Sequence, residues 1–597
     1  MEKDKILAGG EFLLKEKSIG STFIPEEFDE EQKMIIQTCE DFLEAEIYPN
    51  LDRIDNQEKG LMPELLSKAG ELGLLGISIP EEYDGFDQSF LTSMRANEAI
   101  GSAYSYSVAF MAHTGIGTLP ILYYGNEEQK QKYIPKLASG EIKAAYCLTE
   151  PGAGSDANSG KTRATLSEDG KHYILNGQKM WITNGGFADI QTVFAKIDND
   201  RVLSAFIVER DWDGVVINPE EKKMGIKGSS TTQVFYNDVK VPVENLLGDR
   251  GQGFRIALNI LHIGRIKLGA TVLGAAKRTI GFSVNYANER KQFGSLISNF
   301  GAIKYKLAEQ VIKTFSTESA VYAASKDVED TTELYLSQGM PKGEANIKAC
   351  AQFAIECALL KVLGSESLDY IVDEAVQIYG GMGYSAEAPV DRGFRDSRIN
   401  RIFEGTNEIN RLLMVDTIFK RAMKGEIDLF QQAKKVVEEL NETLEQEYVI
   451  KNYFEEKRDY IQNFKNAVLM ILGVGTEKFK RKFVFEQEIW MNISDMIIQL
   501  YAAESTLYRV EKMEMLKEDS GLNGIGIYKN ILDVFIYDAA DVIYKSGADA
   551  INSFTKGKEQ QLLLKALTKF TRVSAVNVKD ARRAIADKLI DDNRYNF

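Results

Sequence analysis

The spacing of apolar residues changes twice along this 597-residue chain, and the order of these changes constrains the fold more than any other feature. Residues 28 to about 140 carry apolar side chains at three- and four-residue spacing, the period of helices with one buried face. From Ala144 to about Gly248, apolar and polar residues alternate in short runs separated by turn-forming sequences, which is typical of strands. Helical spacing returns at Gly253 and continues to the end. The sequence therefore predicts a mainly α protein with a central β domain.

The chain is too long for a single core, so several domains are expected. Their predicted boundaries follow the changes in spacing, without repeats or low-complexity tracts. The prediction is an α–β–α architecture with a C-terminal α-helical extension. It comprises an N-terminal α domain (1–140), a central β domain (141–250), a second α domain of the four-helix-bundle type (251–425) and a C-terminal α-helical domain (426–597).

Composition excludes several classes of function. A net charge of −16 argues against a nucleic-acid partner, because phosphates require a basic face. Cys350 and Cys357, two of only four cysteines, lie in one predicted helical stretch and favour a reducing compartment over disulfides. Three histidines without CxxC or HExxH motifs predict no metal site. No signal peptide or transmembrane segment is expected, so the simplest predicted location is cytoplasmic.

Three glycine-rich segments nearly match phosphate-binding loops. Residues 152–157 (GAGSDA) and 381–386 (GMGYSA) fit a dinucleotide spelling, but the first precedes another strand and the second precedes Pro389. A dinucleotide loop requires a helix immediately afterwards. Residues 154–162 have one residue too many for a P-loop. None of the three is interpreted as a nucleotide motif.

Five segments in order resemble the acyl-CoA dehydrogenase family, most closely its very-long-chain branch, over residues 28–421. They are YCLTEPGAGSD (146–156), KMWITNG (179–185), ERKQFG (289–294), QIYGGMG (377–383) and FEGTNEI (403–409). The resemblance implies the family's α–β–α fold and FAD as the cofactor. A flavin needs an aromatic wall, hydrogen-bond donors and closely approaching backbone, and these segments supply such residue types.

The resemblance implies a set of FAD-binding residues, some of which would reach the FAD of a neighbouring subunit, so at least a homodimer is expected. The residues implied are Tyr146, Leu148, Thr149, Ser155, Trp181, Ile182, Thr183, Arg290, Gln292, Phe293, Gln377, Gly380, Gly381, Thr406 and Glu408. Of these, Arg290, Phe293, Gln377, Gly380 and Gly381 would contact the neighbour's FAD. Relatives often have Gln or Asp at the position of Glu408. The alternatives from residue type alone are a core tryptophan at 181, an exposed arginine at 290 and a helix-capping glycine pair.

The same resemblance places the catalytic base at Glu404. Removing a proton next to a thioester requires a carboxylate in a dry pocket, where burial raises its pKa. Some relatives carry the base one residue before an arginine in the second α domain, but here Gly264 precedes Arg265. Without the motif, Glu404 would be a solvated loop acid before a helix cap at Thr406.

Further substrate-binding residues are implied at Ser155, for the CoA portion, and at Gly264, Arg265 and Gly405 beside the base. Ala112 occupies the position where medium-chain relatives close the pocket with a glutamate, so a longer acyl tail is expected. The block 426–597 also resembles the very-long-chain branch. Its mixed charges favour packing over membrane binding.

The predicted function is FAD-dependent α,β-dehydrogenation of long- or very-long-chain acyl-CoA to trans-2-enoyl-CoA in fatty acid β-oxidation. Electron-transfer flavoprotein is the expected acceptor. Two alternatives remain open: an acyl-CoA oxidase that uses oxygen, and a non-catalytic family member that acts as an assembly factor or a DNA-binding stress protein. The complete motif around Glu404 and the negative charge argue against the second.

Overall fold

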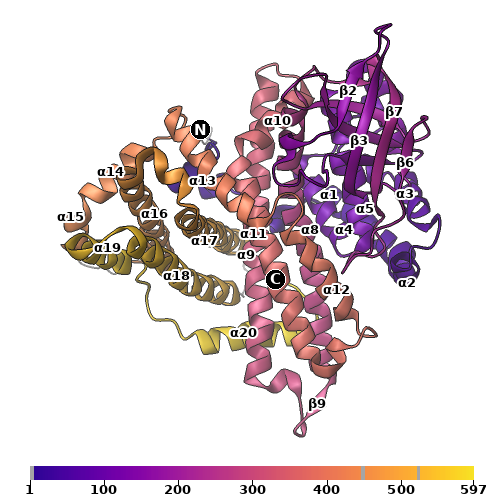
Figure 1. The fold of residues 1–597 in the computed structure, drawn as a ribbon. Coiled ribbons are helices and arrows are strands. Elements are labelled where there is room, and N and C mark those ends of the chain that lie inside the picture. The colour runs from indigo at the N-terminus through magenta and orange to yellow at the C-terminus, as the bar shows by residue number, and fades with distance from the viewer. Residues whose placement is uncertain (1–5, 446–450, 521–524) are drawn as a thin grey trace.

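The computed structural model describes residues 6–445, 451–520 and 525–597. Figure 1 shows a β domain and the N-terminal helices on one side, a bundle of long helices in the middle and a C-terminal helical block on the other side. The predicted fold class, mainly α with a central sheet and a helical extension, is confirmed.

The N-terminal part is built from short helices around a core of their apolar faces. Asp29 and Asn126 begin two of them as N-caps, each in a reciprocal capping box with a glutamine three residues later. The helices are α1 (Glu30–Phe42), α2 (Leu51–Asp55), α3 (Leu61–Glu71), α4 (Phe90–Gly101), α5 (Ser105–Met111), the π-helical segment η8 (Ala112–Gly117), α6 (Leu119–Tyr124) and α7 (Glu127–Ala138).

The β domain is one twisted sheet in the order β6-β7-β3-β2-β4-β5-β8, with β1 parallel to β4. The pairing of β3 with β7 shifts register between Lys179 and Ile182, where Trp181 has a φ of 61°. This bulge turns the tryptophan away from the regular alternation of the strand. The strands are β1 (Ala144–Cys147), β2 (Arg163–Leu166), β3 (His172–Thr183), β4 (Ile190–Ile197), β5 (Ser204–Glu209), β6 (Val215–Ile217), β7 (Thr231–Pro242) and β8 (Leu246–Leu247).

The central bundle is organised around α8. By length and composition α8 could cross a membrane, but 67% of its most apolar window is buried inside the protein, as in the core helix of a bundle. It packs against α11, α4 and α9. The elements are α8 (Gly253–Glu289), β9 (Lys291–Gln292), β10 (Ser295–Leu296), α9 (Gly301–Ser337), α10 (Lys342–Gln352), α11 (Ala354–Tyr379), α12 (Pro389–Ser397), η13 (Arg398–Arg401) and α13 (Asn407–Met423).

One expectation about this bundle is wrong. Cys350 and Cys357 do not share one helix, because the chain breaks at Phe353 between α10 and α11. A carbonyl freed at the end of α10, that of Ala351, accepts a hydrogen bond from Arg421 Nη2 at 3.0 Å. A tertiary contact thus supplies the hydrogen bond that the carbonyl at the helix end lacks. Both cysteines are buried and form no disulfide.

The C-terminal block packs on α9 and α13 and shares one continuous apolar core with the bundle. Buried ion pairs cross the boundary: Arg509 of α17 meets Glu318 of α9 at 2.7 Å, and Arg582 of α20 meets Glu309 at 2.6 Å. The helices are α14 (Leu429–Glu438), α15 (Leu440–Glu445), α16 (Tyr453–Phe479), α17 (Gln487–Ser520), α18 (Gly526–Phe554), α19 (Gly557–Phe570) and α20 (Val578–Asp592).

Candidate active site

Glu404 lies in the short loop that joins η13 to α13. Its φ is 58°, and that of Gly405 is 84°, so two consecutive residues occupy the left-handed region. For a glutamate this conformation is strained and must be held by its surroundings. Thr406 caps α13 by accepting the backbone N–H of Ile409 at 3.3 Å. The loop therefore ends on a fixed helix start.

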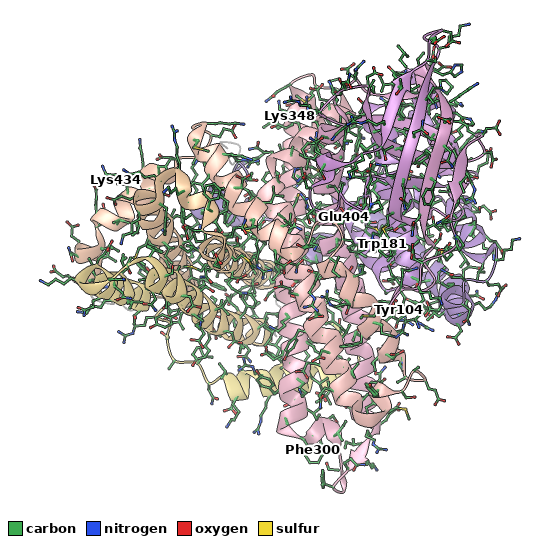
Figure 2. The ribbon with its side chains drawn as sticks, viewed as in Figure 1. Tyr104, Trp181, Phe300, Lys348, Glu404 and Lys434 are labelled. Atoms are coloured by element: carbon green, nitrogen blue, oxygen red, sulfur yellow. The ribbon has the colours of Figure 1, made fainter. Side chains whose placement is uncertain are left out.

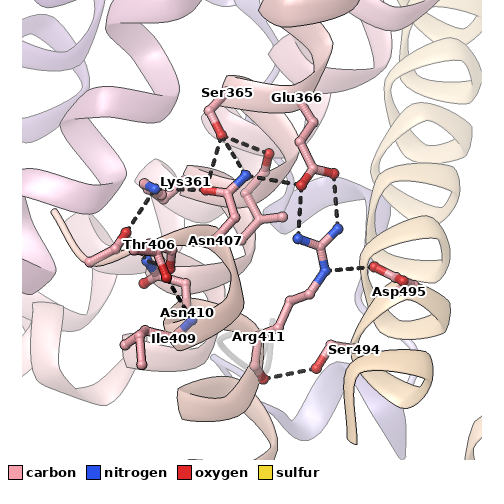
Figure 3. Close-up of polar contacts among 12 residues, drawn as sticks. Lys361, Ser365, Glu366, Thr406, Asn407, Ile409, Asn410, Arg411, Ser494 and Asp495 are labelled. Atoms are coloured by element: carbon pink, nitrogen blue, oxygen red, sulfur yellow. Dashed lines mark hydrogen bonds and ion pairs between the residues drawn. The ribbon is translucent and has the colours of Figure 1, made fainter. Parts of the chain in front are cut away.

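Three side chains from other positions hold the carbonyls of this loop. Arg265 Nε donates to the Glu404 carbonyl at 3.1 Å, and Asn410 Nδ2 donates to the Gly405 carbonyl at 2.8 Å. Lys361 Nζ of α11 donates to the Gly405 carbonyl at 2.8 Å and to Asn407 Oδ1 at 2.6 Å (Figure 3). Three donors from α8, α11 and α13 thus converge on one loop and fix the direction of the Glu404 side chain.

The Glu404 carboxyl group sits in a dry environment. Its Oε2 is buried and has no hydrogen-bond partner in the part of the chain that the structure describes. Burial raises the pKa of Glu404 to about 7, while the positive charges of Arg265 and Lys361 oppose that rise. Gly264 faces the carboxyl group so closely that a Cβ there would lie 2.8 Å from Oε2. The structure therefore contains the expected carboxyl group in a dry pocket and not the alternative, a solvated loop acid.

The Glu404 side chain faces a large cavity between α5, η8, α8, α11 and α12, with about 1070 Å³ of empty space, part of it open to solvent. Thr183 lines it from the β domain, and Ala112 lines it from η8, where the small side chain leaves room. Apolar side chains form much of the remaining wall: Val108, Met111, Ile116, Ile226, Leu268, Val272, Ala275, Leu368, Val372, Ile399 and Phe403. The cavity suits a long hydrocarbon chain next to a carboxylate.

The β-domain side of the site offers what a flavin ring requires. Tyr146 is buried, and its hydroxyl has no hydrogen-bond partner within the described chain. Burial raises the pKa of Tyr146 most, and the charge of Glu404 is the next cause of the rise, so the two groups are neighbours. The Trp181 side chain is 52% exposed at the end of β3, although tryptophan is usually buried (Figure 2). An open indole and an unpaired phenol fit an aromatic, hydrogen-bonding ligand.

The other predicted residues of this half are distributed around it. Leu148, just after β1, and Ile182, in β3, are buried, and Thr149 is half-buried. Ser155 is exposed in the loop after β1, and Glu408 is exposed in the first turn of α13, where its pKa lies below the usual value.

A second group of predicted residues lies far from Glu404. Arg290, Gln292 and Phe293 follow the end of α8, about 38 Å along that helix from Arg265. Gln377, Gly380 and Gly381 lie at the end of α11, which the stacked rings of Tyr286 and Tyr379, 4.0 Å apart, join to the end of α8. All six are exposed, Phe293 to 96%. The described chain thus brings the predicted FAD residues together as two separate groups rather than one.

Several residues of the site were not predicted from the sequence. Lys361 and Asn407 sit beneath the loop, and Lys267, Arg278 and Asp396 line the cavity. Burial lowers the pKa of Lys361 to about 7, which marks an unusual environment that only packing reveals. The one signal in the sequence was a lysine within an otherwise apolar helix (ALLKVL), which also fits a lysine that extends to the surface.

The fold and this site define a class of protein, and sequence comparison identifies the same one. Four segments match families of acyl-CoA dehydrogenase domains: the N-terminal domain over 29–141, the middle domain over 145–239, and C-terminal domains over 251–419 and 463–569. The chain belongs to the acyl-CoA dehydrogenase family.

Individual relatives are similar over different shares of the chain. A probable acyl-CoA dehydrogenase from Bacillus subtilis is 43% identical over 98% of both chains. The mitochondrial very long-chain specific acyl-CoA dehydrogenase of Rattus norvegicus is 45% identical over 58% of this chain and 51% of its own length. The crystal structure of an acyl-CoA dehydrogenase complexed with FAD from Bacillus anthracis superposes with a TM-score of 0.96 at 45% identity, covering 99% of this chain and 100% of that chain.

Proposed function

We propose that this FAD-dependent acyl-CoA dehydrogenase oxidises long- or very-long-chain acyl-CoA to trans-2-enoyl-CoA in fatty acid β-oxidation, with Glu404 as the base. The observation that carries the proposal is a buried carboxyl group with an unpaired oxygen, beside a long apolar cavity. A carboxylate in such surroundings is a stronger base than one in water, as proton abstraction from carbon requires.

Each residue of the loop has a defined task in this reaction. The Glu404 carboxylate takes the proton from the carbon next to the thioester. The Glu404 backbone N–H, which donates to no protein acceptor in the described part of the chain, would then stabilise the negative charge on the thioester oxygen. Gly264 leaves space for the carboxylate, and Arg265 and Lys361 hold the loop. Tyr146 and Trp181 would hold FAD beside the loop, where it would supply a hydride acceptor for the β carbon.

The finer features of the function rest on separate arguments. Ala112 and the length of the cavity favour long acyl chains. The two separate groups of FAD residues favour a homodimer in which each FAD contacts both subunits. Electron-transfer flavoprotein is the proposed acceptor, and the cytoplasm is the proposed location. Ser155 is proposed to contact the CoA portion.

Anaerobic mixing of the purified flavoprotein with palmitoyl-CoA tests the proposal. We expect the flavin absorbance to bleach, and Glu404→Gln to slow bleaching at least about a hundredfold, because general-base catalysis contributes at least that much. Glu82→Gln, an exposed glutamate outside the cavity lining, should bleach at the wild-type rate.

Two outcomes would contradict the proposal. Normal bleaching in Glu404→Gln would exclude Glu404 as the base, and a colourless protein that takes up no flavin would exclude the reaction altogether. Turnover that is faster with oxygen than with an artificial electron acceptor would identify an oxidase instead.

A further inference from the structure

The end of the cavity remote from Glu404 is polar, although its walls are apolar. The lining follows one face of α8 from Gly264, which abuts the Glu404 carboxyl group, through Leu268 and Ala275 to Arg278. Arg278 lies 14 positions after Gly264 along the helix, or about 21 Å at roughly 1.5 Å per residue. A long acyl chain that starts at Glu404 would therefore end near Arg278.

Arg278 lines this end with a positive charge that none of the described carboxylates neutralises. Its guanidinium carbon lies 3.5 Å from the ring centroid of Tyr48, and its Nε is buried without a hydrogen-bond partner among the described residues. None of the carboxylates that the structure describes forms an ion pair with Arg278. The adjacent Lys277, by contrast, turns to Glu98 at 2.6 Å and to Glu318. A sheltered cation without an anion is costly unless a ligand supplies one.

Tyr104 and Asp396 are two other polar residues at this end of the cavity. Tyr104 lines it with a φ of 53°, a strained conformation for a tyrosine, and Figure 2 shows it well away from Glu404. Burial raises the pKa of Tyr104, and the charge of Arg278 is the largest effect that opposes the rise, so the two are neighbours. Tyr104 and Thr279 each lie 3.9 Å from where a Cβ of Gly393 would be, so α5, α8 and α12 meet here.

Asp396 is the one acidic residue among those that line the cavity besides Glu404. Its Oδ1 accepts the backbone N–H of Ile226, and its Oδ2 is buried with no hydrogen-bond partner in the ranges that the structure describes. Burial raises the pKa of Asp396 to about 7. In its neutral form this group donates a hydrogen bond to an incoming carboxylate and does not repel it.

We propose that the polar end, defined as Arg278, Tyr104 and Asp396, binds the terminal carboxylate of long dicarboxylic acyl-CoA substrates. The inference rests on the proposed function and names a substrate class for the same site. With a terminal methyl group, Arg278 keeps its contacts with Tyr48 and Tyr104 but meets no anion. A carboxylate supplies that anion and accepts two hydrogen bonds from the planar fork of Arg278 and one from Tyr104. The apolar stretch between Glu404 and Arg278 then sets the length of the preferred diacid.

Paired substrates of equal length test the inference on the FAD-loaded enzyme. The quantity to measure is the ratio of kcat/KM for the monothioester hexadecanedioyl-CoA to kcat/KM for palmitoyl-CoA. Arg278→Met should lower this ratio at least about tenfold, because a sheltered hydrogen-bonded charge pair is lost. Arg278→Lys should retain most of it, because the charge remains. Flavin content and unfolding temperature show whether each variant is folded.

A shorter pair distinguishes contact at the polar end from a general effect of charge. The terminal carboxylate of octanedioyl-CoA cannot reach Arg278, so its kcat/KM ratio to octanoyl-CoA should be the same in the wild type and Arg278→Met. An unchanged long-chain ratio in Arg278→Met would overturn the inference while the proposed function stands. Failure of palmitoyl-CoA itself to bleach the flavin would overturn the proposed function, and the inference with it.

Discussion

At the scale of single residues, the protonation of Glu404 predicts how the reaction depends on pH. Only the ionised carboxylate accepts a proton, and burial raises its pKa to about 7. The rate of flavin reduction in a single turnover should therefore rise through about pH 7 and level off above it, falling about tenfold per unit well below. Stopped-flow absorbance over roughly pH 5 to 9 measures this. A rate that stays constant down to pH 5 would mean an ordinary, solvated glutamate.

Gly264 is predicted to be required for the position of the base. In Gly264→Ala the new methyl carbon would lie 2.8 Å from Glu404 Oε2 and must displace the carboxyl group. We expect kcat to fall at least about tenfold, since an error of 1 Å in a reacting group can cost a hundredfold. Stability should hardly change, because alanine favours helix by up to about 1 kcal/mol and the displaced group is a flexible side-chain end.

Gly281 in the same helix is the matched control for that substitution. A Cβ at Gly281 meets no atom within 4 Å, so Gly281→Ala adds the same methyl group to open space. Both variants should melt at or above the wild-type temperature, and only Gly264→Ala should lose activity. Equal activities in the two variants would contradict the role of Gly264.

The residues of the site were predictable to different degrees. Glu404 follows from its motif, because the phenylalanine, glycine and threonine around it form one local sequence. Lys361 stabilises the same loop by binding the Gly405 carbonyl from 44 positions earlier in the chain, so no local pattern connects the two. Arg278 lies next to Lys277 in the sequence, and only packing shows that one faces the cavity and the other faces Glu98. A local motif is thus enough to predict the catalytic base, whereas the partners of charged residues can be read only from the folded structure.

At the scale of elements, Lys361 connects α11 to the catalytic loop and acts as a positioning residue. Its positive charge lowers the pKa of Glu404 against the effect of burial. Lys361→Met removes both this charge and the hydrogen bond to the Gly405 carbonyl. We expect a slower single turnover and an acid limb that shifts to higher pH, because the carboxylate loses a stabilising cation. The pH profile of flavin reduction measures the shift.

Ser365 offers a control that loosens the same loop without changing its charge. Its hydroxyl accepts a hydrogen bond from Asn407 Nδ2 at 3.1 Å, so Ser365→Ala weakens the support of α13. This variant should slow the reaction and leave the midpoint of its pH profile in place. A profile of Lys361→Met that coincides with that of Ser365→Ala would show that Lys361 acts through packing alone.

The elements themselves followed largely from hydrophobic spacing, and the exceptions have tertiary causes. The long amphipathic stretches and the alternating strands occur where their periods predict them. The break between α10 and α11 at Phe353 could not be predicted from spacing, because it depends on Arg421, which donates a hydrogen bond to the Ala351 carbonyl there. The bulge at Trp181 could not be predicted from spacing either, since a positive φ in a strand reflects packing rather than local preference. Spacing determines type and order, and contacts determine where elements are interrupted.

At the scale of the whole molecule, the C-terminal block supports the catalytic half instead of forming a separate unit. Arg411 of α13 binds Glu366 of α11 at 2.8 and 2.9 Å and Asp495 of α17 at 2.7 Å (Figure 3). Ser494 of α17 donates to the Arg411 carbonyl at 2.8 Å. The helix that begins at the catalytic loop is therefore attached to both the bundle and the C-terminal block, and the block takes part in positioning Glu404 from a distance.

Arg509 gives the sharpest test of this coupling. Only 1% of its side chain is exposed, and it joins three parts of the chain through Glu318 of α9 at 2.7 Å and Glu26 near the N-terminus at 2.8 Å. Arg509→Met leaves both carboxylates without this partner and should lower the free energy of unfolding by about 3–5 kcal/mol. Arg53→Met removes a pair with Glu58 that is exposed on both sides, so it should leave the urea midpoint almost unchanged.

A second substitution separates loss of the pair from loss of packing. Glu318→Gln added to Arg509→Met removes the negative charge left behind, and Lys277 keeps Glu98 as its partner. The double variant should therefore recover part of the lost stability in urea unfolding, because an uncompensated buried charge accounts for much of the cost. If Arg509→Met unfolded at the wild-type urea concentration, the ion pairs between the block and the bundle would contribute nothing. The apolar core that the two share would then be what holds the C-terminal helices in place.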